Sequence, residues 1–335
     1  MGADALSEVL RAVRLTGAVF FRLEAREPWV AAAPPSVSCA PYVLPGAQHV
    51  IEYHVVHSGS CWGGPMGAEP VRLVAGDIIA FPQGDAFPQG DPHVLSSDPG
   101  LRQEPDLAVY RDAVAAGPPI AYRLGAEGPS TACVICGFLG CDARPFNPLL
   151  EALPRMLHVH SRSDRGASWM GHLVRAAMAE SLTRRIGGEA ILARLSELMF
   201  AELVRRHVES MPPEGAGWFA GLRDPHVGRA LNLLHARPAA PWTLDALARD
   251  VGLSRSSFAE RFMRLVGHPP MQYLARWRMQ LAAGLLTDSA RQVARVAIEV
   301  GYDSEAAFSR AFHKVVGMPP AAWRRSCERG AAVRS

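Results

Sequence analysis

Apolar residues in the first 150 positions occur in short runs that glycine, proline and polar residues interrupt. These runs predict strands at about 17–23, 50–56, 71–74, 77–81 and 131–135. Short strands separated by frequent turn residues are typical of an antiparallel β-sandwich or barrel. The first part of the chain is therefore expected to be an all-β domain.

The pattern changes near residue 148, where five apolar residues recur at helical spacing: Leu149, Leu150, Leu153, Met156 and Leu157. Helices are expected at about 169–185 and 189–208. The second has an apolar stripe of Ile191, Leu192, Leu195, Leu198, Met199, Leu203 and Val204. That stripe either packs against its own domain or forms a dimer interface between two chains. A Pro- and Gly-containing linker follows at 211–217.

From about Leu222 to Arg325 the chain is expected to be helical, and it repeats itself. Leu247–Ser254 leads to Phe258, Phe262, Gly267 and Pro269-Pro270, and Val296–Tyr302 leads to Phe308, Phe312, Gly317 and Pro319-Pro320. The glycines after the first helix match at an offset of 49 residues and the phenylalanines at 50, so the second turn is one residue longer. A repeat of this kind predicts two helix-turn-helix units.

Each unit has the local signals of a helix-turn-helix. Thr243 is the expected N-cap of the first helix, Gly252 supplies the turn, and Ser254 caps the second helix. Ser304 has the same role in the second unit. With the phenylalanines facing inward, the outward residues are Arg255, Ser256, Ser257, Ala259, Glu260 and Arg264, and in the second unit Glu305, Ala306, Ala307, Ser309, Arg310 and Lys314. One continuous helix over 271–286 could hold the two units about 34 Å apart, one turn of DNA.

Charge is distributed unevenly along the chain. Residues 226–325 contain 14 Lys and Arg against 7 Asp and Glu, whereas residues 1–225 contain 19 against 24. Only the C-terminal part is therefore suited to a polyanion. No apolar run approaches the roughly 18 residues of a membrane span. The N-terminus lacks the basic start and apolar core of a signal peptide, so a cytoplasmic protein without a membrane partner is expected.

The segment Ile298–Pro320, IEVGYDSEAAFSRAFHKVVGMPP, is very similar to the C-terminal signature of the AraC/XylS family of bacterial regulators. The resemblance covers residues 226–325 and implies sequence-specific binding to promoter DNA. Carried over by position, the base-contacting sites are Ser256, Ala259 and Glu260, and Ala306, Ala307 and Arg310. A guanidinium can bond guanine O6 and N7 together, so Arg310 is the strongest candidate.

Residues 1–150 resemble the cupin-type sensor found on one branch of this family. The matching pieces include HVVHSGSCW (54–62) and VRLVAGDIIAFP (71–82). Cupins are small β-barrels, and a common metal site in them uses an H-x-H pair with a third histidine after a Gly-rich turn. Here His54 and His57 are three apart and would face opposite ways, so no complete metal triad is expected. A direct duplication, 80–85 repeated at 86–91, also shifts His93 and suggests a lengthened loop.

Three cysteines, Cys133, Cys136 and Cys141, lie close together in the sequence. They are core residues, or a reactive thiol or switchable disulfide, or ligands of a metal site. That site would include Cys61, His54 or His93, with zinc as the candidate metal. Alternation along a strand places Cys133 and Cys136 on opposite faces, which argues against convergence. His158 and His160 are expected to be surface residues rather than ligands.

The expected architecture is α+β. It comprises a cupin-like barrel sensor over 1–150, a helical linker and dimerisation region over 151–215, and an all-α domain with two helix-turn-helix motifs over 222–326. The expected function is DNA-binding transcription regulation, as an activator that contacts RNA polymerase. The expected assembly is a homodimer that responds to a small-molecule or oxidant effector. The alternatives are a cupin metalloenzyme fused to a DNA-binding module and an architectural DNA-binding protein without an effector; no catalytic residues are assigned.

Overall fold

The computed structural model describes residues 4–83, 92–116, 120–160, 169–181, 185–212, 215–288 and 291–332. Most of the duplicated segment, from 84 to 91, lies outside the described residues. Contacts within the chain group it into two compact units. We call them by their expected roles: the sensor unit contains residues 15–142 and 153–209, and the DNA-binding unit contains the residues up to Arg14, 143–152 and those from 210 onward.

The sensor unit contains a curled sheet, as the short apolar runs predict, and helices in addition. The sheet has the order β2-β6-β3-β8-β1-β7, with β4 and β5 also paired to β3, and β9 paired to β5. The strands are β1 (Thr16–Arg26), β2 (Val30–Ala33), β3 (His49–Pro65), β4 (Val71–Val74), β5 (Ile78–Phe81), β6 (His93–Ser96), β7 (Ile120–Gly125), β8 (Ala132–Cys141) and β9 (Leu157–Val159). Every run expected to be a strand coincides with one of them to within one residue.

The long strand β3 curls the sheet because it takes part in two sets of pairings. Its first half pairs with β8 and β5, and residues 60–65 pair with β4 and β6. The change occurs after a register shift between Val56 and Ser58, next to Gly59 with φ +76°. A Cβ on Gly59 would lie 2.0 Å from the carbonyl oxygen of Thr131, so only glycine fits this bend.

Helix α6 (Gly188–Ser210) packs against the sheet through one face only. The hydroxyls of Tyr53 and Ser196 form a buried hydrogen bond of 2.8 Å between β3 and this helix. A Cβ on Gly17 would lie 2.3 Å from the carbonyl oxygen of Ala193, so the helix approaches β1 at a glycine. The predicted stripe is split, because Leu192, Met199, Leu203 and Val204 are buried whereas Ile191 and Leu198 are about half exposed.

Other helices of the sensor unit were partly foreseen. Helix α5 (Trp169–Ser181) lies where a helix was predicted. Helices α2 (Ser36–Val43) and α3 (Leu107–Ala116) interrupt the predicted all-β region. The helix expected from the spacing of Leu149 to Leu157 is wrong beyond its first turn: α4 (Pro148–Ala152) ends before Pro154, and Leu157 begins β9.

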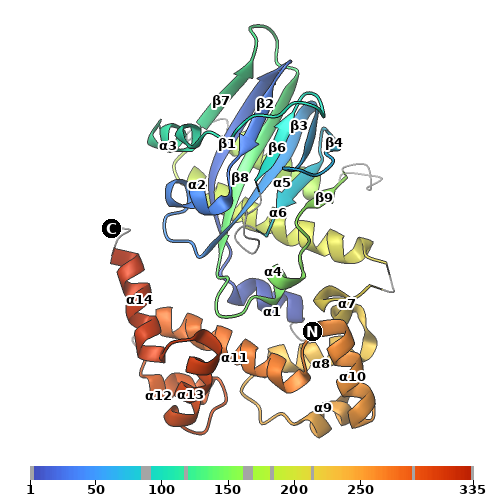
Figure 1. Cartoon of the computed structure of the whole chain (residues 1–335), viewed down its shortest axis with the longest axis vertical. Coiled ribbons are helices and arrows are strands. Elements are labelled where there is room, and N and C mark those ends of the chain that lie inside the picture. Colours follow the sequence, from blue (N-terminus) through green and yellow to red (C-terminus); the bar gives the residue numbers. More distant parts are fainter. Residues whose placement is uncertain are drawn as a thin grey trace. The chain divides into compact units, whose positions relative to one another are not determined.

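The DNA-binding unit contains the predicted helical repeat together with two segments from the N-terminal half of the chain. Its repeat comprises α7 (Trp218–Arg223), α8 (Pro225–Ala236), α9 (Leu244–Val251), α10 (Arg255–Val266), α11 (Pro270–Asp288), α12 (Val293–Glu299), α13 (Glu305–Val316) and α14 (Pro320–Ala332). Helix α1 (Ala5–Ala12) and segment 143–152, which contains α4, pack with these helices (Figure 1). The predicted domain boundaries, 1–150 for the sensor, 151–215 for the linker and 222–326 for the DNA-binding domain, remain predictions.

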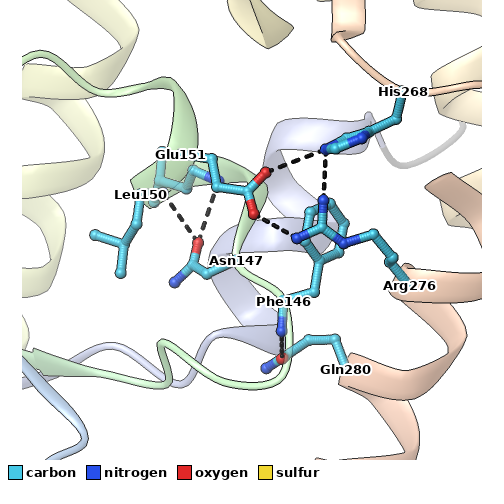
Figure 2. A network of polar contacts seen from close by, with 8 residues as sticks. Phe146, Asn147, Leu150, Glu151, His268, Arg276 and Gln280 are labelled. Carbon is cyan, nitrogen blue, oxygen red and sulfur yellow. Dashed lines mark hydrogen bonds and ion pairs between the residues drawn. The ribbon is translucent and has the colours of Figure 1, made fainter. Parts of the chain in front are cut away.

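Segment 143–152 is held on α11 by a polar network (Figure 2). The Glu151 carboxylate lies 2.6 Å from the Arg276 guanidinium and 3.6 Å from the His268 ring. The Phe146 amide donates to the Gln280 side chain at 3.0 Å, and the Arg276 guanidinium lies 4.1 Å from the centre of the Phe146 ring. Ionic, hydrogen-bonding and cation–π contacts therefore fix this segment on the connecting helix.

Candidate functional site

The first helix-turn-helix is formed by α9 and α10, with the caps that the sequence predicts. The Thr243 hydroxyl accepts from the Ala246 amide, and Gly252 ends α9 with φ +77°. The Ser254 hydroxyl accepts from the Ser257 amide at the start of α10. An ion pair between Arg261 of α10 and the Asp224 carboxylate at the start of α8, 2.9 Å from Nε, fixes α10 against the unit.

The second helix-turn-helix repeats this construction with α12 and α13. Ser304 caps α13 by accepting from the Ala307 amide, and Gly301 provides the turn with φ +86°. In both helix-turn-helix motifs two phenylalanines are fully buried, Phe258 and Phe262 in the first and Phe308 and Phe312 in the second. These phenylalanines determine which face of α10 and of α13 packs inward. They therefore also determine which face of each helix is exposed.

That opposite face is the one expected to meet DNA. In α10, Arg255, Ser256, Ser257, Glu260 and Arg264 are exposed and Ala259 is half-buried. In α13, Glu305, Ala306, Arg310 and Lys314 are exposed, and Ala307 and Ser309 are half-buried. The capping residues Ser254 and Ser304 are exposed too. Among the described residues, Arg310 and Lys314 take part in no ion pair, whereas Arg255 lies 3.6 Å from Asp245.

The connector between the two helix-turn-helix motifs is α11, which is longer than the predicted 271–286. Its Tyr273 hydroxyl contacts the Trp218 indole nitrogen at 2.8 Å and His235 Nε2 at 2.7 Å, so it is anchored to α7 and α8. On the other side, the Arg278 guanidinium donates to the carbonyls of Pro238 and Ala240 and lies 5.7 Å from the Tyr302 ring. These contacts anchor α11 to α7, α8 and the loop before α9, and α10, α12 and α13 also pack on it.

A second candidate site lies inside the sensor unit, where a cavity of about 90 Å³ opens between the sheet and α3. Its wall is mostly apolar, with Phe21, Leu23, Leu95 and Phe138 among the lining residues. Polar groups gather in one place: Glu52, His54, His93, Tyr110 and Cys136. A mostly apolar cavity with a few convergent polar groups is the usual form of a ligand site.

Glu52, His54 and His93 form a compact group that can hold a metal ion. All three side chains are buried, and their ligand atoms lie within 4.8 Å of one another. His54 Nε2 lies 2.6 Å from His93 Nε2 and 3.8 Å from Glu52 Oε1, and Glu52 Oε2 lies 3.9 Å from His93 Nε2. His54 Nδ1 and Glu52 Oε2 have no hydrogen-bond partner in the described part of the chain. Two imidazoles and a carboxylate fit a divalent transition metal.

Burial controls the protonation of this group. It raises the pKa of Glu52 to about 8, against the lowering effect of a hydrogen bond from Tyr110. It also lowers the pKa of His54 well below its usual value, and the nearby His93 adds to the lowering. Without a metal, the carboxyl is therefore protonated and His54 neutral at pH 7.

Comparison with known proteins gives two family matches and several relatives. Residues 4–209 match the family model described as a cupin, and residues 247–326 match the one described as a helix-turn-helix domain. An AraC-like transcription regulator of Streptomyces lividans is 34% identical over 282 residues, which are 83% of this chain and 88% of the relative. The chain belongs to the cupin-containing AraC-like transcription regulators.

Two other relatives match different shares of the regulator. The HTH-type transcriptional regulator AlkR of Acinetobacter baylyi is 28% identical and covers 96% of this chain and 99% of its own length. The RCS-specific HTH-type transcriptional activator RclR of Escherichia coli is 28% identical over 61% of this chain and 72% of its own length. These relatives are named as regulators of transcription, so the interpretation as a cupin enzyme is not favoured.

The regulator's sensor cavity corrects one expectation from the sequence. No complete metal triad was expected there, yet the structure brings His54 and His93 together with Glu52, which the sequence analysis missed. His57 is exposed, as the alternation along β3 predicts. The signal was Glu52-x-His54: residues two apart on a strand share a face, and a carboxylate replaces the first histidine of the H-x-H pattern.

The cysteines of the regulator are dispersed rather than gathered into a site. None of the six forms a disulfide; Cys61 and Cys141 are buried, and Cys133 and Cys136 are half-buried. Cys136 lines the cavity, but no cysteine belongs to either group of potential metal ligands among the described residues. Burial raises the pKa of Cys61 to about 12 and raises those of Cys133, Cys136 and Cys141 as well. A raised pKa disfavours the reactive thiolate, which supports the core interpretation of these thiols.

None of the helices in the described part of the regulator is both long and apolar enough to cross a membrane.

Proposed function

We propose that this AraC-family regulator contacts promoter DNA through the exposed faces of α10 and α13. The observation that carries the proposal is the repeated geometry: two helices, each capped by serine and fixed by two buried phenylalanines, present polar and basic residues on one connector. The proposed contacts are Ser254, Arg255, Ser256, Ser257, Ala259, Glu260, Arg264, Ser304, Glu305, Ala306, Ala307, Ser309, Arg310 and Lys314. We expect the two helices to enter successive major grooves, as recognition helices one DNA turn apart do.

The two helices differ in the contacts that they offer. In α13, exposed Arg310 suits a bidentate contact with guanine, and Lys314 suits a phosphate. In α10, Ala259 suits the methyl group of thymine and Glu260 accepts from the amine of cytosine. We therefore expect α13 to contribute more sequence specificity than α10.

Selection of bound sequences from a random DNA library tests this proposal. The expected result is a site with two conserved blocks about 10–10.5 base pairs apart, one for each helix-turn-helix. A second selection with the Arg310→Ala variant assigns the blocks to the helices. The block that loses its conserved guanine in this selection is the one that α13 contacts. Enrichment of a single block, or of none, would contradict the use of both motifs.

We also propose a homodimer formed through α6, and the exposed half of its apolar stripe supports this. Ile191 and Leu198 are about half exposed, and Leu195 lies between them on the same face of the helix. The ion pair of Arg194 and Glu197, 2.8 Å long, flanks them. An apolar seam with flanking charges is what a helix pair between subunits needs.

The sensor cavity is the proposed effector site, and a divalent metal ion held by Glu52, His54 and His93 is the proposed first ligand. The residues Cys61, Cys133, Cys136 and Cys141 are then not ligands. Elemental analysis of freshly purified protein, with a thiol count before and after mild peroxide, tests this. A metal that His93→Gln removes supports the proposal, whereas metal-free protein whose thiols oxidise reversibly with a change in DNA affinity would favour the oxidant response instead.

Activation through a contact with RNA polymerase is the proposed direction of regulation. The support is the resemblance to a family that more often activates, and the name of the relative RclR as a transcriptional activator. Transcription in vitro from the selected site, with and without the regulator, gives the sign directly.

A further inference from the structure

A second group of potential metal ligands lies at the edge of the sensor sheet, where β5 and β9 pair. The group consists of Asp77, His158 and His160. Ile78 is opposite Val159 and Ile79 is opposite His158 in this antiparallel pair. One step further, Asp77 comes opposite His160. His158 and His160 are two residues apart and share a side, with ring centres 4.1 Å apart.

The distances within this group are those of ligands around one ion. Asp77 Oδ2 lies 3.4 Å from His158 Nε2 and 3.7 Å from His160 Nδ1. Two ligands at about 2.1 Å from a tetrahedral zinc ion are about 3.4 Å apart. All three ligand atoms lie within 4.8 Å of one another, so closing the site needs only small movements of the side chains.

The surroundings suit a metal that reaches the site from solvent. The Asp77 side chain is 1% exposed, that of His158 is 12% exposed and that of His160 is 66% exposed. The Val74 amide donates to Asp77 Oδ2 at 3.1 Å and so orients the carboxylate.

We propose that Asp77, His158 and His160 bind a divalent transition-metal ion of the zinc type, with water at the open position. Two imidazoles with one carboxylate select this class over Mg²⁺ and Ca²⁺, which prefer oxygen ligands. The site is separate from the proposed effector site, because none of its three residues lines the sensor cavity. His158 was expected from the sequence to be a surface residue, but its side chain is mostly buried beside Asp77.

Such an ion fastens the three-residue strand β9 to β5. Among the described strands, β9 pairs only with β5. A ligand that binds only the folded state stabilises that state by mass action, so zinc is expected to raise the melting temperature of the full chain.

The test uses the full-length protein, stripped with a chelator and titrated with zinc in a calorimeter. Variant His160→Ala removes the exposed ligand and is expected to fold normally, because its side chain lies mostly in solvent. We expect it to lose one bound zinc per chain, or about 100-fold or more in affinity for that zinc, together with part of the zinc-dependent rise in melting temperature. His160→Asp, which restores a ligand, is expected to recover both.

Two controls separate this site from other sources of zinc binding. His57→Ala removes another exposed imidazole of the sensor unit and should leave stoichiometry and melting temperature unchanged. His93→Gln disables the cavity group and should leave the zinc that His160 controls. Equal stoichiometry, affinity and melting shift in the wild type and His160→Ala would overturn the proposal, whatever the result with His93→Gln.

Discussion

Arg310 extends from the exposed face of α13 without an ion-pair partner among the described residues. If it bonds both acceptors of a guanine, Arg310→Ala should weaken binding to the selected site by about 1–3 kcal/mol, roughly 5- to 150-fold. Fluorescence anisotropy with specific and scrambled DNA measures this change. Arg310→Lys keeps the charge but loses the fork of donors. Full recovery by the lysine variant would show that only a phosphate is contacted.

The raised pKa of Glu52 predicts that the stability of the sensor unit depends on pH. The folded-state pKa of Glu52, about 8, lies above the ordinary value of 4.5, so its contribution is fully present at low pH and is lost as the pH rises toward 8. Between pH 6.5 and 8 the chelator-treated protein should lose up to about 1.4 kcal/mol per pH unit. His54, whose pKa is lowered, acts only below its ordinary value of 6.5.

Denaturant titrations at several pH values measure that slope. Glu52→Gln keeps the shape of a protonated carboxyl and should flatten the curve, whereas the exposed control Glu69→Gln should not. An equal slope in the wild type and Glu52→Gln would place the titrating group elsewhere.

Among the elements, α6 carries the proposed dimer seam on its exposed face. Leu198→Glu places a charge in that seam and should convert dimers to monomers, because a buried unpaired charge is costly. Sedimentation equilibrium gives the change in mass, and circular dichroism shows whether the fold persists. Ser210→Glu, at the exposed end of the helix, is the matched control. Dimers of unchanged stability in the Leu198 variant would exclude this face.

Segment 143–152 is the element most suited to carry a signal, because it follows β8 of the sensor sheet and packs on α11. Glu151→Ala removes the ion pair with Arg276 and the contact with His268. The loss of stability should stay within about 1 kcal/mol, since the pair is partly exposed. The difference in DNA affinity between metal-loaded and metal-free protein should shrink.

Anisotropy titrations in both metal states measure that difference. Glu8→Ala, which breaks the Glu8–Arg11 ion pair of α1 in the same unit, serves as the control. A difference that is the same in the Glu151 variant and the wild type would show that the signal takes another route.

The sequence predicted the elements whose signals are local. Caps at Thr243, Ser254 and Ser304 and the turn at Gly252 depend on neighbouring residues, and all are confirmed. The packing of α1 with the DNA-binding unit depends on a contact across 227 residues, from the Ala5 amide to Asn232, which no local pattern encodes. The Glu52–His54–His93 group likewise requires β3 and β6 to pair. The sequence analysis named His54 and His93 as candidate ligands but missed Glu52, although Glu52 and His54 are two apart on one strand.

At the scale of the whole molecule, the excess of positive charge lies in the C-terminal third of the chain. Binding to DNA should therefore weaken steeply with salt, by a factor of about 10³ between 50 and 200 mM for some six phosphate contacts. Lys314→Gln should lower the slope of log affinity against log salt by about 1 and weaken all sequences alike. A slope that does not change would remove Lys314 from the phosphate contacts.

The chain passes between its two units after residues 14, 142, 152 and 209, and this limits how the molecule can be recombined. A chimaera that joins a foreign DNA-binding domain at residue 215 would retain α1 and segment 143–152 without the helices they pack on. Ala5, Val9 and Phe146, each at most 1% exposed, would then face water. A chimaera that keeps these contacts must exchange residues 1–14, 143–152 and 210–335 together. The part of this regulator that can be exchanged as one piece is therefore larger than the helix-turn-helix region.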